Sequence, residues 1–210
     1  MFAVECEEVK SYDQYCPIAH ALGLVGERWS LLVVRELLDG PKRYTDLVAG
    51  LPKIGTNILA ARLKDLEAAG VVEKRRLPPP AASTVYELTA YGRDLRPVIH
   101  ELARWGVRSL GPPPLDALEP GWLVHALDLG LSPLASEGRI AFRVGEEEAS
   151  LVGGRVEAGL VDDADVLVDT DAAGFYHLFV NGQLEGVRVE GDAELLEHML
   201  VAFAPTPLPA

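Results

Sequence analysis

Three consecutive prolines, Pro112 to Pro114, lie where the charge of this 210-residue chain changes. Residues 1–111 carry 15 Lys and Arg against 14 Asp and Glu, whereas residues 112–210 carry 4 against 18. A proline run is stiff and extended, so it favours a spacer over a continuous fold. The sequence therefore predicts two domains, residues 1–111 and 119–210, joined by a linker over residues 112–118.

Hydrophobic residues make up 49% of the chain and charged residues 24%, which allows each half to bury a core. The apolar runs are shorter than the roughly 20 residues that span a bilayer, and the acidic N-terminus does not resemble a secretory signal. We therefore expect a cytoplasmic protein with no membrane partner. Cys6 and Cys16 have no histidines at metal-ligand spacing, so we expect no metal and no cofactor.

The spacing of apolar residues predicts several helices in the first half. They span residues 16–25, 27–38, 45–48 and 56–69. Thr45 and Thr56 are of a residue type that caps helix N-termini, and Gly70 provides a C-terminal stop. Because only a short turn separates the last two helices, they are predicted to form a helix-turn-helix.

Two extended stretches follow, residues 71–77 and 84–88, and a proline-rich loop joins them into a predicted hairpin, or wing. From Thr89 onward the pattern predicts a helix with one apolar stripe. The stripe consists of Leu95, Val98, Ile99, Leu102 and Trp105. It needs a partner, either within its own subunit or on a second copy. Because an operator usually has two half-sites, we favour dimerisation.

Basic residues outnumber acidic ones by 8 to 4 between Lys42 and Arg76, so this segment could face phosphates. In a helix-turn-helix the second helix reads base edges, while the wing and first helix hold the backbone. The predicted contacts on the second helix are Thr56, Asn57, Ala60, Ala61 and Arg62, with Asn57 and Arg62 as base readers. The predicted phosphate contacts are Lys42, Arg43, Lys53, Lys64, Lys74, Arg75 and Arg76. The alternative is that these are ordinary solvated charges.

An ordered series of short motifs runs through the same region. It includes Cys16-Pro17-Ile18, Gly26-Glu27-Arg28-Trp29, Arg43-Tyr44-Thr45-Asp46-Leu47, Gly70-Val71-Val72 and Tyr86-Glu87-Leu88-Thr89. In this order, residues 14–110 resemble the HxlR family of winged helix-turn-helix regulators. The resemblance implies a homodimer that binds an operator in double-stranded DNA, most often as a repressor. Relatives carry arginine at the wing tip, but this chain has Ala81-Ala82-Ser83, so that contact does not carry over.

Cys16 matches the cysteine at the start of the family motif, which some members use to sense oxidants or electrophiles. A sensing thiol needs access to solvent and surroundings that favour the thiolate, such as a helix N-terminus before Pro17. The alternative is a small buried hydrophobic residue at the dimer interface.

The second half predicts strands over residues 138–144, 148–156, 164–170 and 184–189, and helices over residues 171–180 and 192–203. This order is typical of an α+β domain with a mainly antiparallel sheet. Asp171 and Asp192 are the expected helix caps. The pair Gly153-Gly154 is interpreted as a bulge.

The segments Ala164-Asp165-Val166, Asn181-Gly182 and Val187 to Asp192 resemble the sterol-carrier-protein-type domain. The resemblance implies an apolar tunnel for a small, lipid-like molecule. The predicted lining residues are Leu178, Phe179, Leu195, Met199 and Phe203. Equally, these residues could simply form the core, as apolar residues at helical spacing usually do.

Three functions remain open. The first is a repressor whose second domain binds an apolar effector that changes the spacing of the two recognition helices. The second is a regulator with Cys16 as its sensor, in which the second domain is an uncoupled carrier or interaction module. The third is an enzyme, but the five histidines are scattered and no nucleophile elbow or phosphate-binding glycine loop is present. We therefore expect no catalytic activity.

Overall fold

The computed structural model of the chain describes residues 12–80, 82–114, 118, 120–130 and 138–203, with side chains as far as residue 201. The chain divides into two compact units, Met1–Ile99 and His100–Ala210. None of the described helices has the length and hydrophobicity that a bilayer crossing demands. The division falls within a helix that precedes the proline run.

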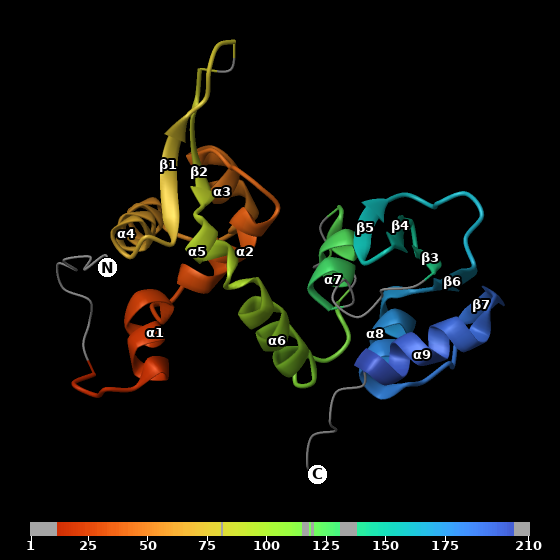
Figure 1. Cartoon of the computed structure of the whole chain (residues 1–210). Helices are drawn as coiled ribbons and strands as arrows, with labels where there is room; N and C mark the ends of the chain where they lie inside the picture. Colours follow the sequence, from red (N-terminus) through yellow and green to blue (C-terminus); the bar gives the residue numbers. More distant parts are fainter. Residues whose placement is uncertain (1–11, 81, 115–117, 119, 131–137, 204–210) are drawn as a thin grey trace. The chain divides into compact units, whose positions relative to one another are not determined.

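The first unit combines a cluster of helices with a two-stranded hairpin (Figure 1). Its elements are α1 (Pro17–Val25), α2 (Ser30–Leu38), α3 (Tyr44–Gly50), α4 (Thr56–Ala68), β1 (Val72–Arg76), β2 (Thr84–Leu88) and α5 (Ala90–Arg93), followed by the start of α6 (Arg96–Val107). Helix α4 buries Leu59, Leu63 and Leu66 at steps of four and three residues, which places them on one face. Helix α2 and strand β1 both contact α4, so the apolar face of α4 anchors it in this core.

Two of the expected helix starts and one of the expected helix caps are wrong. Tyr44 rather than Thr45 begins α3, because the Asp46 carboxylate accepts a hydrogen bond from the Arg43 backbone N–H at 2.9 Å and places the cap one residue earlier. Gly55, not Thr56, is the N-cap of α4. Likewise α2 starts at Ser30 rather than at residue 27, because Trp29 has a φ of 80°, which is not helical.

The predicted wing is present as an antiparallel hairpin that projects beyond the helices of its unit (Figure 1), with Val72 opposite Leu88 and Arg76 opposite Thr84. The single helix expected after Thr89 is instead two helices. Thr89 caps α5 by accepting from the Gly92 N–H at 3.0 Å. Gly92 is buried, and a Cβ added there would meet the Val71 carbonyl oxygen. Pro97 in the first turn of α6 has no N–H to continue the α5 hydrogen bonds.

The second unit is an α+β arrangement with a mainly antiparallel sheet, as the strand pattern predicts (Figure 1). After the end of α6, its elements are α7 (Trp122–Gly130), β3 (Arg139–Val144), β4 (Glu147–Val152), β5 (Arg155–Ala158), β6 (Val166–Thr170), α8 (Ala172–Asn181), β7 (Arg188–Gly191) and α9 (Ala193–Phe203). The strand order is β5-β4-β3-β6-β7, and among the described strands the β3–β6 pair alone is parallel.

The interpretation of Gly153-Gly154 as a bulge is wrong. Both glycines have positive φ, 56° and 75°, and form the two-residue turn between β4 and β5. Such a hairpin turn needs positive φ at both positions, which glycine adopts without a steric penalty. The predicted strand over residues 148–156 is therefore two strands. The final strand also lies later than expected, at residues 188–191.

The core of the second unit is built on aromatic rings that meet at an angle. The Phe175 ring centroid lies 5.8 Å from that of Trp122, 6.2 Å from that of Phe142 and 4.8 Å from that of Phe179. Asp171 caps α8 as expected, accepting from the Gly174 N–H at 2.7 Å. The cap fixes the start of α8 and so directs its aromatic residues towards the sheet.

Candidate functional site

Helix α4 turns a polar, exposed surface outward at its N-terminal end. Thr56, Asn57 and Ala60 are exposed, while Leu59 between them is fully buried. The Tyr44 hydroxyl donates to the Thr56 carbonyl oxygen at 2.7 Å and so fastens α3 to the first residue of α4. The structure thus brings together the helix pair and the exposed face that the sequence predicts for base contact.

The two predicted base readers have different surroundings. Asn57 is exposed. By contrast, the Arg62 side chain is 15% exposed, and its Nη1 lies 3.0 Å from a carboxylate oxygen of Asp65 and 3.5 Å from one of Glu27. Ala61 is half-buried beside it. Arg62 is therefore held against its own helix and the turn between α1 and α2.

Most predicted phosphate contacts are exposed. These are Arg43, Lys53, Lys64, Lys74, Arg75 and Arg76. Lys42 differs, because its side chain is 23% exposed and its Nζ lies 2.9 Å from Glu36 and 3.5 Å from Asp39. The Lys42 backbone also exchanges hydrogen bonds with Tyr86 of β2, at 3.0 and 2.8 Å. Lys42 therefore joins the segment before α3 to the wing.

Glu36 is a buried carboxylate beneath this junction, with its side chain 7% exposed. Burial alone would raise the pKa of Glu36, but hydrogen bonds from Lys42 and Arg35, with the charges of both, outweigh it and lower the pKa. The donors lie at 2.9 Å (Lys42 Nζ) and 2.6 Å (Arg35 Nη2). A Cβ at Gly50 would meet a Glu36 carboxylate oxygen, so a larger residue there would displace this carboxylate. Glu36 thus ties α2 to the segment before α3 through Lys42.

The three basic residues of the wing are not equivalent. The Arg75 guanidinium binds both oxygens of Glu87 across the hairpin, and this hydrogen bonding raises the pKa of Arg75 and lowers that of Glu87. Lys74 Nζ lies 5.7 Å from the centroid of the Tyr86 ring. Arg76 has no ion pair within the described part of the chain. Arg76 is therefore the wing cation best placed for a phosphate.

Cys16 occupies the N-cap position of α1, with an extended backbone and Pro17 after it. Its thiol is free and half-buried. Cys6 lies outside the described residues.

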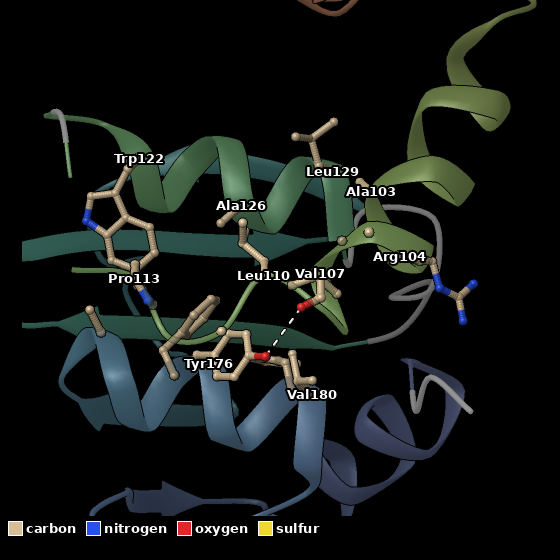
Figure 2. Close-up of a pocket in the computed structure, with 16 residues that line it drawn as sticks. Ala103, Arg104, Val107, Leu110, Pro113, Trp122, Ala126, Leu129, Tyr176 and Val180 are labelled. Carbon is tan, nitrogen blue, oxygen red and sulfur yellow. Dashed lines mark hydrogen bonds between the residues drawn. The ribbon is translucent and has the colours of Figure 1, made fainter. Parts of the chain in front are cut away.

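The second unit contains an apolar cavity of about 510 Å³ (Figure 2). Its walls come from the end of α6, the proline run, α7 and α8. The lining residues are Ala103, Arg104, Gly106, Val107, Leu110, Gly111, Pro113, Trp122, Ala126, Leu129, Gly130, Ala172, Phe175, Tyr176, Phe179 and Val180. A volume of this size suits a small organic molecule.

Of the lining residues predicted from the sequence, Phe179 lies on the cavity wall. Leu178 and Met199 are buried in the core of the unit, and Leu195 packs against that core. The side chain of Phe203 lies outside the described residues. Sequence reasoning missed the contribution of α6 and the prolines, because it assigned α6 to the first domain and the prolines to a linker. The four-residue step between Ala103 and Val107 was the available signal.

Polar groups around the cavity are few. The Tyr176 hydroxyl donates to the Val107 carbonyl oxygen at 3.4 Å. The Arg104 side chain points away from the cavity in Figure 2, and its Nη1 lies 3.3 Å from Glu101. The arrangement therefore suits an uncharged, mostly apolar molecule. No group of three or more potential metal ligands comes together among the residues that the structure describes.

Residues 24–113 match the HxlR-like helix-turn-helix family. The chain is 34% identical over 105 residues to the uncharacterized HTH-type transcriptional regulator YvaP of Bacillus subtilis, covering 50% of this chain and 97% of YvaP. It is 38% identical over 98 residues to the HTH-type transcriptional regulator YodB of the same species, covering 46% of this chain and 88% of YodB. The solved reduced form of YodB from B. subtilis is 35% identical, covers 48% of this chain and 100% of that chain, and gives a TM-score of 0.41.

Proposed function

This chain belongs to the HxlR-like helix-turn-helix transcriptional regulators, and on that premise we propose that it is a homodimeric repressor of sequence-specific operators. Proteins of this kind bind DNA and are not enzymes. The observation that carries the proposal is the exposed N-terminal face of α4, which Tyr44 fastens to α3. A protein that binds an operator acts on the chromosome, so the cytoplasm is the proposed compartment.

In the proposed complex the N-terminal end of α4 lies in the major groove. Asn57 can form a bidentate pair with adenine, and Thr56 lies beside it. Arg43, Lys53 and Arg76 supply the phosphate contacts that fix the register of the protein on the duplex. Arg43 and Lys53 flank the helix pair in sequence, and both are exposed.

The proposed dimer contact is the exposed part of the predicted apolar stripe, since Leu95 precedes α6 and Ile99 is buried. Val98, Leu102 and Trp105 are 46%, 44% and 67% exposed. On α1, Ile18 and Leu22 are 71% and 46% exposed. Large apolar side chains gathered on exposed helix faces are typical of surfaces that associate. A two-fold dimer would present two α4 helices to two half-sites.

Within the second unit, residues 119–210 are proposed as an effector-binding domain of the sterol-carrier-protein type, with residues 112–118 as the linker before it. The apolar cavity supports this role. With only four basic residues after the proline run, an anionic effector is disfavoured. A small apolar effector bound there would change operator affinity by changing the spacing of the two α4 helices in the dimer.

The proposal is tested in two steps. Native mass spectrometry of the purified protein should give a dimer mass and any small molecule bound to it. An operator is then selected from a random double-stranded DNA library, and its affinity is compared for the wild type, Asn57→Ala and Glu67→Ala. Glu67 is also exposed on α4 but lies near its C-terminus. Failure to enrich any sequence, or equal losses in both variants, would contradict the assignment.

A second candidate function places the input at Cys16 and leaves the second unit as an uncoupled carrier or interaction module. It is favoured by the position of Cys16 at the N-cap of α1, with a thiol that is half-buried and not in a disulfide. Treatment with diamide should then weaken operator binding of the wild type and leave Cys16→Ser unchanged. An identical response in both proteins would exclude Cys16 as the sensor.

A further inference from the structure

Helix α6 has two different faces. Val98, Leu102 and Trp105 follow one another at steps of four and three residues, which places them in one exposed stripe. Ala103 and Val107 are four residues apart and line the cavity. At 3.6 residues per turn these two sets lie on nearly opposite sides of the helix. The surface proposed for dimerisation and the wall of the cavity are therefore two sides of one element.

We infer that α6 couples the cavity to the dimer contact, and that the coupling ligand is an uncharged, mainly apolar molecule with one hydrogen-bond acceptor. The inference rests on the function proposed above, which supplies the dimer and the effector. It adds the chemical class of the ligand and the route by which occupancy is sensed.

The ligand class follows from the walls. Figure 2 shows Trp122 and Ala126 on one side of the cavity and Tyr176 and Val180 on the other. The Tyr176 hydroxyl bond to Val107 is 3.4 Å long, well beyond the roughly 2.7–2.8 Å of a strong O–H···O bond. A ligand hydroxyl or carbonyl can therefore replace Val107 as the acceptor at little cost. Among the lining residues only Arg104 is charged, and its guanidinium is directed away from the cavity and paired with Glu101, so it is not placed to neutralise a ligand carboxylate.

The coupling follows from packing. Protein interiors are close-packed, and side chains beside a void lack contact partners on that side. Ala103 and Val107 line the cavity, so an apolar molecule bound there packs directly against this side of α6. These added contacts hold α6 in place while a second copy packs against the exposed stripe on its other side. Occupancy is therefore expected to tighten the dimer.

The test uses the full chain with 1-decanol as the neutral probe and decanoate as its charged counterpart. Calorimetry measures probe binding, and analytical ultracentrifugation measures the dimer dissociation constant. Saturating 1-decanol should tighten the dimer about fivefold or more, the lower end of typical allosteric couplings. Decanoate should bind more weakly than 1-decanol. Tyr176→Phe should bind 1-decanol about threefold or more weakly, the loss of one hydrogen bond.

Matched variants separate the cavity from other sites. Ala126→Phe fills the cavity from α7 and should tighten the dimer without the alcohol and remove the response to it. Ala158→Phe adds the same side chain on the exposed surface of β5 and should behave as the wild type. If Ala126→Phe fails to fold, Trp105→Glu provides the reciprocal measurement. This monomeric variant should bind 1-decanol more weakly than each subunit of the dimer does, by the square root of the change in the dimer constant, because one dimer binds two molecules.

The outcomes distinguish the inference from the proposed function. If 1-decanol binds and the dimer forms, but the dimer constant is the same with and without alcohol, the coupling is overturned and the proposed function stands. Absence of alcohol binding would overturn the effector role of the second unit. A chain that stays monomeric at all concentrations would overturn the dimer.

Discussion

The exposed face of α4 and the cavity of the second unit differ in how their residues relate to the core. On α4, Thr56 and Asn57 point outward, while Leu59 and Leu63 of the same helix hold the fold. In the second unit, Phe175 and Phe179 line the cavity and also belong to the aromatic core. Substitutions on the exposed face of α4, which suits a polyanion, can therefore leave the fold of the first unit intact. Substitutions in the cavity, which suits an apolar molecule, also alter the core of the second unit.

The two regions also differ in the number of charged side chains and in how these are paired. Several cations near α4 already have carboxylate partners, as Arg62, Lys42 and Arg75 do. These ion pairs hold neighbouring segments of the first unit together. They leave a smaller group of exposed cations that can bind phosphate. Around the cavity, Arg104 is the one charged residue among those that line it, and its guanidinium is directed away towards Glu101, because an unpaired ion facing an apolar space is strongly unfavourable.

The largest expected effect is on the shared residues of the second unit. Phe175→Ala should lower the free energy of unfolding by about 3–5 kcal/mol, because it removes a ring that packs against three others. Urea denaturation followed by tryptophan fluorescence measures this loss, since Trp122 is one of those neighbours. Phe175→Leu serves as a milder control. A loss below about 0.5 kcal/mol, ordinary for a surface position, would contradict the idea that cavity wall and core are the same residues.

The next effect concerns the buried carboxylate of the first unit. Glu36→Gln should lower the free energy of unfolding by about 3 kcal/mol, because it leaves Lys42 and Arg35 without their shared charge partner. Asp39→Asn, at a more exposed carboxylate, is the matched control and should have a much smaller effect.

The same carboxylate predicts a pH dependence. The pKa of Glu36 is lower in the folded chain than its ordinary value of 4.5, so its stabilisation is fully present above that pH. Stability should fall as the pH drops below 4.5 through the lowered pKa, and the wild type and Glu36→Gln should converge there. Urea midpoints measured across this range check the sign. A constant difference between the two proteins down to acid pH would contradict it.

At the exposed face of α4, the effect should fall on binding and not on stability. Asn57→Ala should weaken binding to a selected operator by about 2 kcal/mol, the contribution of one bidentate base contact. The free energy of unfolding should stay within about 0.5 kcal/mol of the wild type, because the side chain is exposed. Fluorescence anisotropy and urea denaturation measure the two quantities. A variant that is both less stable and weaker in binding would show that this face is not independent of the core.

The smallest effect separates two arginines of the wing. Arg76→Ala should reduce the slope of log affinity against log salt by about 0.9, as expected for one lost phosphate contact. Arg75→Ala should change the slope less, because its guanidinium is already bound to Glu87. Operator titrations at several salt concentrations give both slopes. The reverse order would mean that the Arg75–Glu87 pair opens on DNA.

Local patterns were sufficient for most helices and strands of both units. The wing follows from two extended runs around a proline-rich loop, and Asp171 caps α8 as its residue type predicts. The errors arose where one short sequence pattern is compatible with two local structures. A Gly-Gly pair suits a bulge or a hairpin turn, and only the pairing of β4 with β5 selects the turn.

The exposed face of α4 could be predicted from the sequence better than the cavity could, because its residues are close together in the chain. Exposed polar residues on an amphipathic helix stand out in the sequence, so the face of α4 could be placed in advance. A cavity wall is built from residues distant in the chain, here Ala103, Pro113 and Tyr176, and no periodicity links them. One of the two carboxylate partners of Arg62 was equally hidden, because Glu27 lies on a different segment, whereas Asp65 lies three residues further along α4.

The sequence by itself determined the helix-turn-helix, the wing, the mainly antiparallel sheet and the change of charge at the prolines. These depend on interactions between residues close in the chain, such as caps, turns and alternating burial. Only the tertiary structure decided which cations near α4 are paired and which residues enclose the cavity. Both depend on contacts between distant segments, where side-chain packing and not local propensity selects the partner.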